Sequence, residues 1–120
     1  MSQANHKRAR VITAYQAQYP DPIRVKAGEQ IRVGGEDPEF PGWKWCTASN
    51  GRSGWVPIEL LSGSAPDASI IQDYSAQELS VVAGEELNIE DARHSWLLVR
   101  NATGEHGWIP ASHVTTLDQH

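Results

Sequence analysis

A repeated pair of short motifs constrains this chain more than any other feature. Gly28–Val33 (GEQIRV) recurs as Gly84–Ile89 (GEELNI), and Gly54–Pro57 (GWVP) recurs as Gly107–Pro110 (GWIP). An internal repeat decides the architecture of a chain, because each copy is one structural unit. The sequence therefore predicts two small domains in series in place of one domain of 120 residues.

The spacing of single aromatic residues extends the repeat. Trp43 and Trp96 each stand eleven residues before the Gly-Trp motif of their copy, and Tyr15 and Tyr74 open the two copies. The offset between copies falls from 59 at the Tyr to 56 at Gly28 and 53 at the Trp. Two deletions of three residues explain this fall, and both lie in expected loops, where changes of length are tolerated.

The local pattern is that of short strands separated by turns. β-branched and aromatic residues gather in segments bounded by Gly, Pro, Asn or Asp, and Asn50-Gly51 is a strong hairpin signal. Helical periodicity is absent, apart from single 3₁₀ turns expected at 58–60 and 111–113. The expected strands are 10–15, 30–34, 43–48, 52–56 and a short end near 61, then 69–74, 86–90, 96–101, 106–109 and 114–116.

The repeat and the composition between the copies set the expected domain boundaries. Residues 1–9 are polar and basic and are expected to form a flexible arm, followed by a first domain at 10–61. Residues 62–68 (SGSAPDA) are small and polar with Pro and Gly, which indicates a linker. The second domain is expected at 69–117.

Charge is unevenly distributed between the halves. Residues 1–61 carry eight Lys/Arg and six Asp/Glu, a net charge of +2, whereas residues 62–120 carry two and nine, a net charge of -7. The acidic second half argues against a nucleic-acid partner, which requires neutralisation of phosphates. No signal peptide or membrane-spanning stretch is seen, and the single cysteine, Cys46, excludes an internal disulfide. A cytoplasmic, reducing location is therefore expected, without a membrane partner.

Taken in order, these motifs resemble the SH3 domain, twice. The opening of that family corresponds to 11–15 and 70–74, and its Leu-x-Phe-x-x-Gly-Glu motif to 23–29 and 79–85. Trp43 and Trp96 match the Trp of the binding groove, and both Gly-Trp-x-Pro motifs match the family signature. The resemblance covers about 10–61 and 70–116 and implies an all-β fold of two small five-stranded SH3-like barrels in tandem.

The resemblance also implies peptide-binding grooves, because SH3 domains bind extended, proline-rich segments on aromatic ridges. Carried over by position, the first groove would use Tyr15, Trp43, Trp55, Pro57 and Leu60, with Tyr19 and Asp21 from its long loop. The second would use Tyr74, Glu78, Trp96, Trp108, Pro110 and His113. The acidic residues Asp21 and Glu78 would attract a basic ligand residue, and Trp43 and Trp96 are expected to be exposed. The first groove, with the longer loop, is the better candidate.

The other residues that could carry chemistry are expected to lie in the core or on the solvated surface. Cys46 is expected in the core, since its neighbours supply no base for a nucleophile. The spacing of His94, His106 and His113 matches no metal-ligand pattern, so neither a metal nor another cofactor is expected. Trp45, where the family has an aliphatic residue, either extends the aromatic surface or fills space between the domains.

We therefore expect a non-catalytic module that binds a protein or peptide. Paired carboxylates, a phosphate-binding loop and a Ser/His/Asp arrangement are all missing from the sequence at usable spacing. The main alternative is a structural protein that self-associates through its aromatic faces. Binding of single-stranded nucleic acid on aromatic platforms, or of a cell wall after export, stays open with less support.

Overall fold

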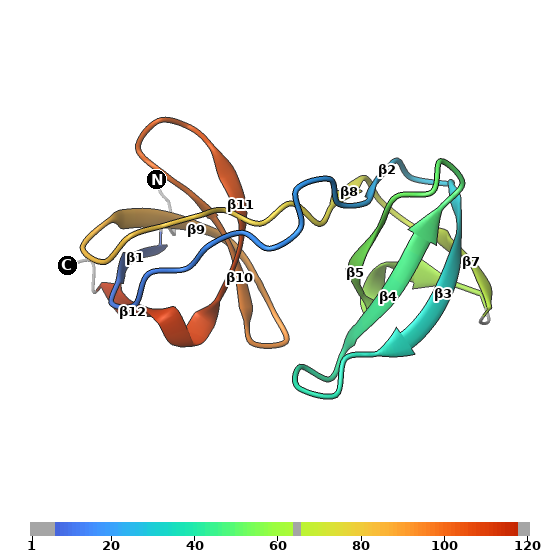
Figure 1. Cartoon of the computed structure of the whole chain (residues 1–120), viewed down its shortest axis with the longest axis horizontal. Coiled ribbons are helices and arrows are strands. Elements are labelled where there is room, and N and C mark those ends of the chain that lie inside the picture. Colours follow the sequence, from blue (N-terminus) through green and yellow to red (C-terminus); the bar gives the residue numbers. More distant parts are fainter. Residues whose placement is uncertain (1–6, 64–65, 118–120) are drawn as a thin grey trace, which may run out of the picture. The chain divides into compact units, whose positions relative to one another are not determined.

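The computed structural model describes residues 7–63 and 66–117, in which the chain is all-β apart from short 3₁₀ turns. It forms two compact units (Figure 1). Unit 1 combines the chain up to Gln18 with the chain from Glu78 onward, and unit 2 is Tyr19–Gln77. In the described residues no helix is long and apolar enough to cross a membrane.

Unit 1 is built on a five-stranded antiparallel sheet in the order β11-β10-β9-β1-β12. These strands are β1 (Lys7–Val11), β9 (Glu86–Arg93), β10 (Trp96–Arg100), β11 (His106–Pro110) and β12 (Val114–Leu117). The 3₁₀ turn η2 (Ala111–His113) joins β11 to β12. Strand β1, drawn in blue in Figure 1, therefore lies between two strands from the far end of the sequence.

Unit 2 repeats this order as β5-β4-β3-β7-β6, again antiparallel. Its strands are β3 (Gln30–Glu36), β4 (Trp43–Ala48), β5 (Ser53–Pro57), β6 (Leu61–Ser62) and β7 (Asp67–Ile70), with η1 (Ile58–Leu60) before β6. A further pair, β2 (Arg24–Val25) with β8 (Tyr74–Ser75), belongs to the same unit.

The two repeats exchange their first strands. Strand β1 of the first repeat pairs with β9 and β12 of the second, and β7 of the second repeat pairs with β3 and β6 of the first. The boundaries expected from the repeat, 10–61 and 69–117, thus describe the repeats in the sequence. Each compact unit draws on both repeats.

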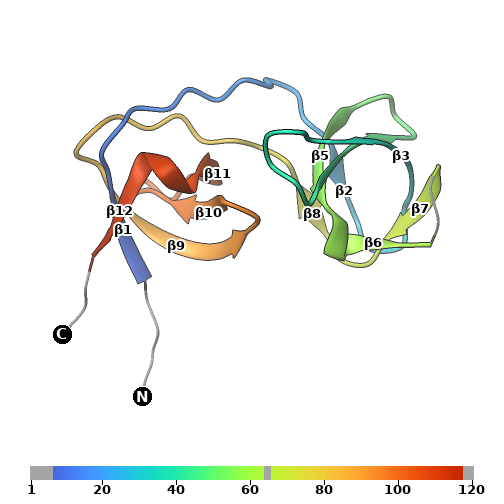
Figure 2. The same cartoon turned by 90° about the horizontal axis from the view of Figure 1, so that it is seen from below.

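The segment between the repeats explains how β7 reaches unit 2. Leu61 pairs with Ile70, and Ser62 pairs with Ser69, so β6 and β7 form a hairpin (Figure 2). The loop between these strands is short, so closing the hairpin costs little conformational entropy. The expected linker 62–68 accordingly ends within strands on both sides, while residues 64–65 lie outside the described residues.

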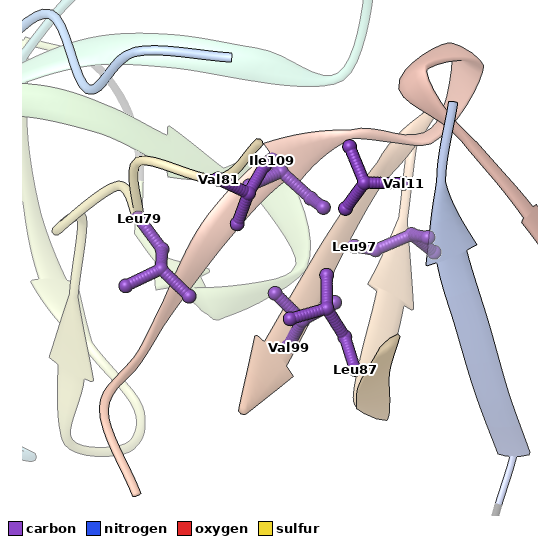
Figure 3. Packing of buried hydrophobic residues seen from close by; sticks show 7 residues of the cluster. All are labelled: Val11, Leu79, Val81, Leu87, Leu97, Val99 and Ile109. Atoms are coloured by element: carbon purple, nitrogen blue, oxygen red, sulfur yellow. The ribbon is translucent and has the colours of Figure 1, made fainter. Parts of the chain in front are cut away.

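The exchange is visible in the buried core of unit 1. Val11 of the first repeat is 1% exposed and packs in one cluster with side chains of the second repeat, which are Leu79, Val81, Leu87, Leu97, Val99 and Ile109 (Figure 3). At the corresponding position of unit 2, Ile70 of the second repeat is also 1% exposed. Burial of apolar surface is the main stabilising term in folding, so each unit depends on a strand from the other repeat.

The strands and turns expected from the sequence are largely present. Strand β4 has the expected bounds, and η1 and η2 lie at the expected 3₁₀ turns. The Asn50-Gly51 hairpin forms with positive φ at Gly51 alone, where glycine has no Cβ to clash. Lys7, Arg8 and Ala9 belong to β1 and not to the expected flexible arm, whose residues 1–6 lie outside the described residues.

Candidate functional site

Unit 1 holds an aromatic cluster made by both repeats. We define the unit 1 cluster as Tyr15, Trp96 and His113. The Tyr15 ring meets Trp96 edge-on at 5.8 Å between centroids and His113 edge-on at 5.5 Å. Edge-to-face contacts at this distance are favourable for aromatic rings. All three side chains are half-buried, so each also offers part of its surface to solvent.

Backbone hydrogen bonds position the members of this cluster. Tyr15 exchanges two of them with Val81, at 3.0 and 2.8 Å, which fixes the first repeat along the second. The carbonyl of His113, the last residue of η2, accepts bonds from the N–H groups of Ile12 and Thr13 at 2.8 and 3.1 Å. Trp96 starts β10. Trp96 is therefore held in a strand, and Tyr15 and His113 are held by backbone hydrogen bonds between the two repeats.

A carboxylate lies next to the cluster. Oε1 of Glu78 accepts hydrogen bonds from the Tyr15 hydroxyl at 2.8 Å and from the N–H of Gln18 at 2.9 Å. Glu78 is 9% exposed. A buried carboxylate needs such donors, because an unpaired charge away from water is costly. Glu78 therefore serves the internal structure of unit 1.

Unit 2 carries a different aromatic cluster, which we define as Tyr19, Trp45 and Trp55. Trp45 lies opposite Trp55 across β4 and β5, with ring centroids 5.0 Å apart, and Tyr19 lies 5.5 Å from Trp45. The three side chains are half-buried. The nearby loop residue Asp21 pairs with Arg52 at 3.2 Å.

Several aromatic residues expected in the grooves are buried. Trp43 is 4% exposed, contrary to the expectation of exposure, and Trp108 is 5% exposed. Tyr74 is buried, and its hydroxyl donates a 2.7 Å hydrogen bond to the carbonyl of Trp55. Leu60, at the position of His113, is buried as well. The residues of unit 2 that correspond to the unit 1 cluster, Tyr74, Trp43 and Leu60, are thus all buried.

The structure regroups the predicted site residues. Unit 1 contains Tyr15, Glu78, Trp96, Trp108, Pro110 and His113, and unit 2 contains Tyr19, Asp21, Trp43, Trp55, Pro57, Leu60 and Tyr74. Tyr15 and Tyr74 have therefore changed places relative to the two grooves expected. Trp45 was outside the predicted set, although its spacing of two from Trp43 and its departure from the family pattern were visible signals.

Cys46 is a core residue, as expected. Its side chain is fully buried, and this burial raises the pKa of the thiol from 9.0 to about 11. Such a thiol is protonated at neutral pH and is a poor nucleophile. Within residues 7–63 and 66–117, no group of three or more His, Cys, Asp or Glu side chains is arranged to hold a metal ion.

Comparison with known proteins identifies part of this architecture. The variant SH3 domain family matches residues 8–62, which covers β1 and most of unit 2. Neither the curated proteins nor the solved structures gave a significant match. The family match begins within β1, whereas in unit 2 of the structure β3 pairs with β7. Residues 8–62 of this chain thus resemble a variant SH3 domain.

Proposed function

We propose that this protein binds a protein partner through the unit 1 cluster of Tyr15, Trp96 and His113, and that unit 2 and unit 1 are both SH3-like. SH3 domains are in general interaction modules without catalytic activity. The shared strand order of the two sheets supports the extension of this family to unit 1. The observation that carries the choice of surface is that all three side chains are partly exposed, whereas their counterparts in unit 2, Tyr74, Trp43 and Leu60, are buried.

The ligand we propose is an extended, proline-rich segment. Prolyl rings pack well on flat aromatic faces, and an extended segment loses little conformational entropy on binding. Trp96 lies opposite Pro110 in the β10–β11 pair, and Pro110 is buried while Trp96 is half-buried. Aromatic anchors of this kind contribute much of the binding energy at interfaces.

The contacts of the two predicted acidic residues, one in each unit, favour a ligand without a basic anchor. Both carboxylates that the sequence offered for a basic ligand residue have partners within the chain, Glu78 with Tyr15 and Asp21 with Arg52. Breaking either contact would offset part of the gain from a new ion pair. We therefore propose that recognition rests on apolar contacts. We also propose that the protein resides in the cytoplasm.

Trp96→Ala, measured against Trp45→Ala as the matched control, tests this function. An array of proline-rich peptides with and without Arg is probed with the full chain, and affinities of the positive peptides are measured by calorimetry. Trp96→Ala should weaken binding by at least about tenfold, with Trp45→Ala close to wild type. Equal binding by all three proteins would refute the proposed surface, and loss only in Trp45→Ala would move the site to the unit 2 cluster.

Self-association is a second candidate function, supported by exposed apolar side chains. Ile12 and Ile71, which correspond in the two repeats, are both 56% exposed, and Val82 is 63% exposed. Exposed apolar side chains can contribute to an interface between protein molecules. Sedimentation velocity of the wild type and of Ile12→Ser/Ile71→Ser tests this candidate: a concentration-dependent increase in mass in the wild type alone supports it.

A further inference from the structure

We propose that charge decides which strands pair in this protein, and that it selects the exchanged arrangement over one in which each repeat keeps its own first strand. Apolar burial discriminates little between the two first strands, because they fill equivalent core positions. All four side chains concerned are buried, Ala9 with its counterpart Ala68 and Val11 with its counterpart Ile70. The exposed positions of the strands differ in charge.

In unit 1 the exchange brings basic and acidic side chains together. Arg10 lies opposite Glu86, and the hydrogen bond from Val11 N–H to Glu85 O makes this a non-hydrogen-bonded pair, in which side chains come closest. Nη2 of Arg10 is 3.0 Å from Oε2 of Glu86, and Nη2 of Arg8 is 3.2 Å from Oε1. One carboxylate thus faces two guanidinium groups.

In unit 2 the exchange also brings opposite charges together, but here the incoming strand carries the acidic residue and the receiving strand the basic one. Asp67 of β7 lies opposite Arg32 of β3. The hydrogen bond from Val33 N–H to Pro66 O, at 2.7 Å, makes this a non-hydrogen-bonded pair as well. Opposite charges on directly facing residues stabilise a strand pair.

The unexchanged arrangement would lose these pairs. The offsets of 59 and 56 between the repeats place Arg8 at the position of Asp67, and Asn88 at the position of Arg32. Arg8 would then face Arg32, and like charges directly opposite destabilise a strand pair. Asp67 would face Asn88, so its opposite-charge partner would be lost.

The difference in net charge between the two halves of the chain also favours the exchanged pairing. The first repeat supplies the basic strand KRARV, and the second supplies the acidic strand ELNIEDAR to receive it. The family match at 8–62 begins within β1, so the first repeat has a segment of its own at the position that β7 takes in unit 2. Two arrangements with similar cores are therefore available to one sequence, and small differences in free energy choose between them.

The variant Arg32→Glu/Glu86→Arg reverses the preference without changing the net charge. In the exchanged arrangement the new carboxylate at position 32 would face Asp67, and the new guanidinium at position 86 would face both Arg8 and Arg10, so every pair becomes repulsive. In the unexchanged arrangement Arg8 would face the new carboxylate, which is a favourable pair. The matched control Lys26→Glu/Glu39→Arg makes a similar change at exposed residues of unit 2 outside these strand pairs.

Engineered disulfides report the arrangement. Gln30→Cys/Ser69→Cys links facing residues of the exchanged pairing, and Ser69→Cys/Thr115→Cys links residues that would face each other only without exchange. Cys46 is fully buried and stays in place. After mild oxidation, peptide mapping should find the first crosslink in wild type and control. The ratio compared is the yield of the second crosslink divided by the yield of the first. This ratio should be at least about tenfold higher in the charge-reversed variant than in the wild type.

Two results would overturn the proposal: the second crosslink dominating in the wild type, or an unchanged ratio in the charge-reversed variant while it stays folded by circular dichroism. If that variant does not fold, Arg32→Gln/Glu86→Gln removes the charges without adding repulsion. It should shift the ratio in the same direction by a smaller factor, and an unchanged ratio there counts against the proposal. The assay reads strand pairing alone, so its outcome is independent of the proposed ligand binding.

Discussion

The hydroxyl of Tyr15 donates a 2.8 Å hydrogen bond to Oε1 of Glu78, a residue 63 positions later in the chain. Tyr15 belongs to the first repeat and Glu78 to the second, so this bond exists because the strands are exchanged. It joins the aromatic cluster of unit 1 to a buried carboxylate. The same bond therefore connects the fold of unit 1 to the surface proposed for binding.

Tyr15→Phe should lower the free energy of unfolding by about 1–3 kcal/mol, because it leaves the buried Glu78 carboxylate with one donor fewer. Urea denaturation followed by Trp fluorescence measures the change. Tyr19→Phe is the matched control, since the half-buried Tyr19 contacts Trp45 through its ring. An equal loss in the two variants would show that the Tyr15 bond contributes nothing specific.

Val11→Ala should destabilise unit 1 by about 2 kcal/mol, through lost burial and a cavity in its core. Hydrogen exchange measured by mass spectrometry should show faster exchange in β9, β10 and β11, although Val11 belongs to the first repeat. Ile70→Ala should make hydrogen exchange faster in β3, β4 and β5 in the same way. If Val11→Ala accelerated β3–β5 instead, the first strand would be completing unit 2.

The sequence predicted strands and turns well because local signals determine them. The Pro residues at 57 and 110 fix the extended backbone before each 3₁₀ turn, and Gly51 permits its positive φ. The partner of each first strand was not predictable from apolar pattern. Val11 and Ile70 are similar in size and occupy equivalent positions, so both pairings bury the same kind of side chain.

The predicted site residues are divided between the two units differently from the two grooves expected from the sequence. Tyr15 meets Trp96 and His113 of the second repeat, which follows from the strand exchange and not from any motif. Trp43 and Trp96 occupy equivalent sequence positions, yet one is buried and the other half-buried. Exposure depends on the neighbours that the tertiary fold supplies, and a repeat in the sequence does not specify these.

Gly54→Ala should destabilise unit 2 by about 1–3 kcal/mol through overpacking. A Cβ at this position would lie 2.9 Å from Cγ2 of Ile23 and 3.0 Å from Cβ of Ala76, and both neighbours are buried and confined. The matched control is Gly35→Ala, where a Cβ would meet nothing within 4 Å. Thermal melting followed by circular dichroism compares the two. A melting temperature for Gly54→Ala equal to that of the control would contradict the close contact with Ile23.

The stability of the protein should fall at alkaline pH through Cys46. Burial raises the pKa of this thiol from 9.0 to about 11, so the folded state holds its proton where the unfolded state has released it. The contribution of the protonated thiol to the free energy of unfolding is fully present below pH 9 and is lost as the pH rises to about 11. The free energy of unfolding should fall by an amount on the order of 2–3 kcal/mol over this range. Other groups titrate in the same range, and Cys46→Ala provides the reference that retains them. Urea denaturation between pH 8 and about 11 should therefore show a steeper loss of stability in the wild type than in Cys46→Ala, since only the wild type has a thiol that ionises in the unfolded state and stays protonated in the folded state. Parallel slopes would mean that the thiol is solvated in the folded protein.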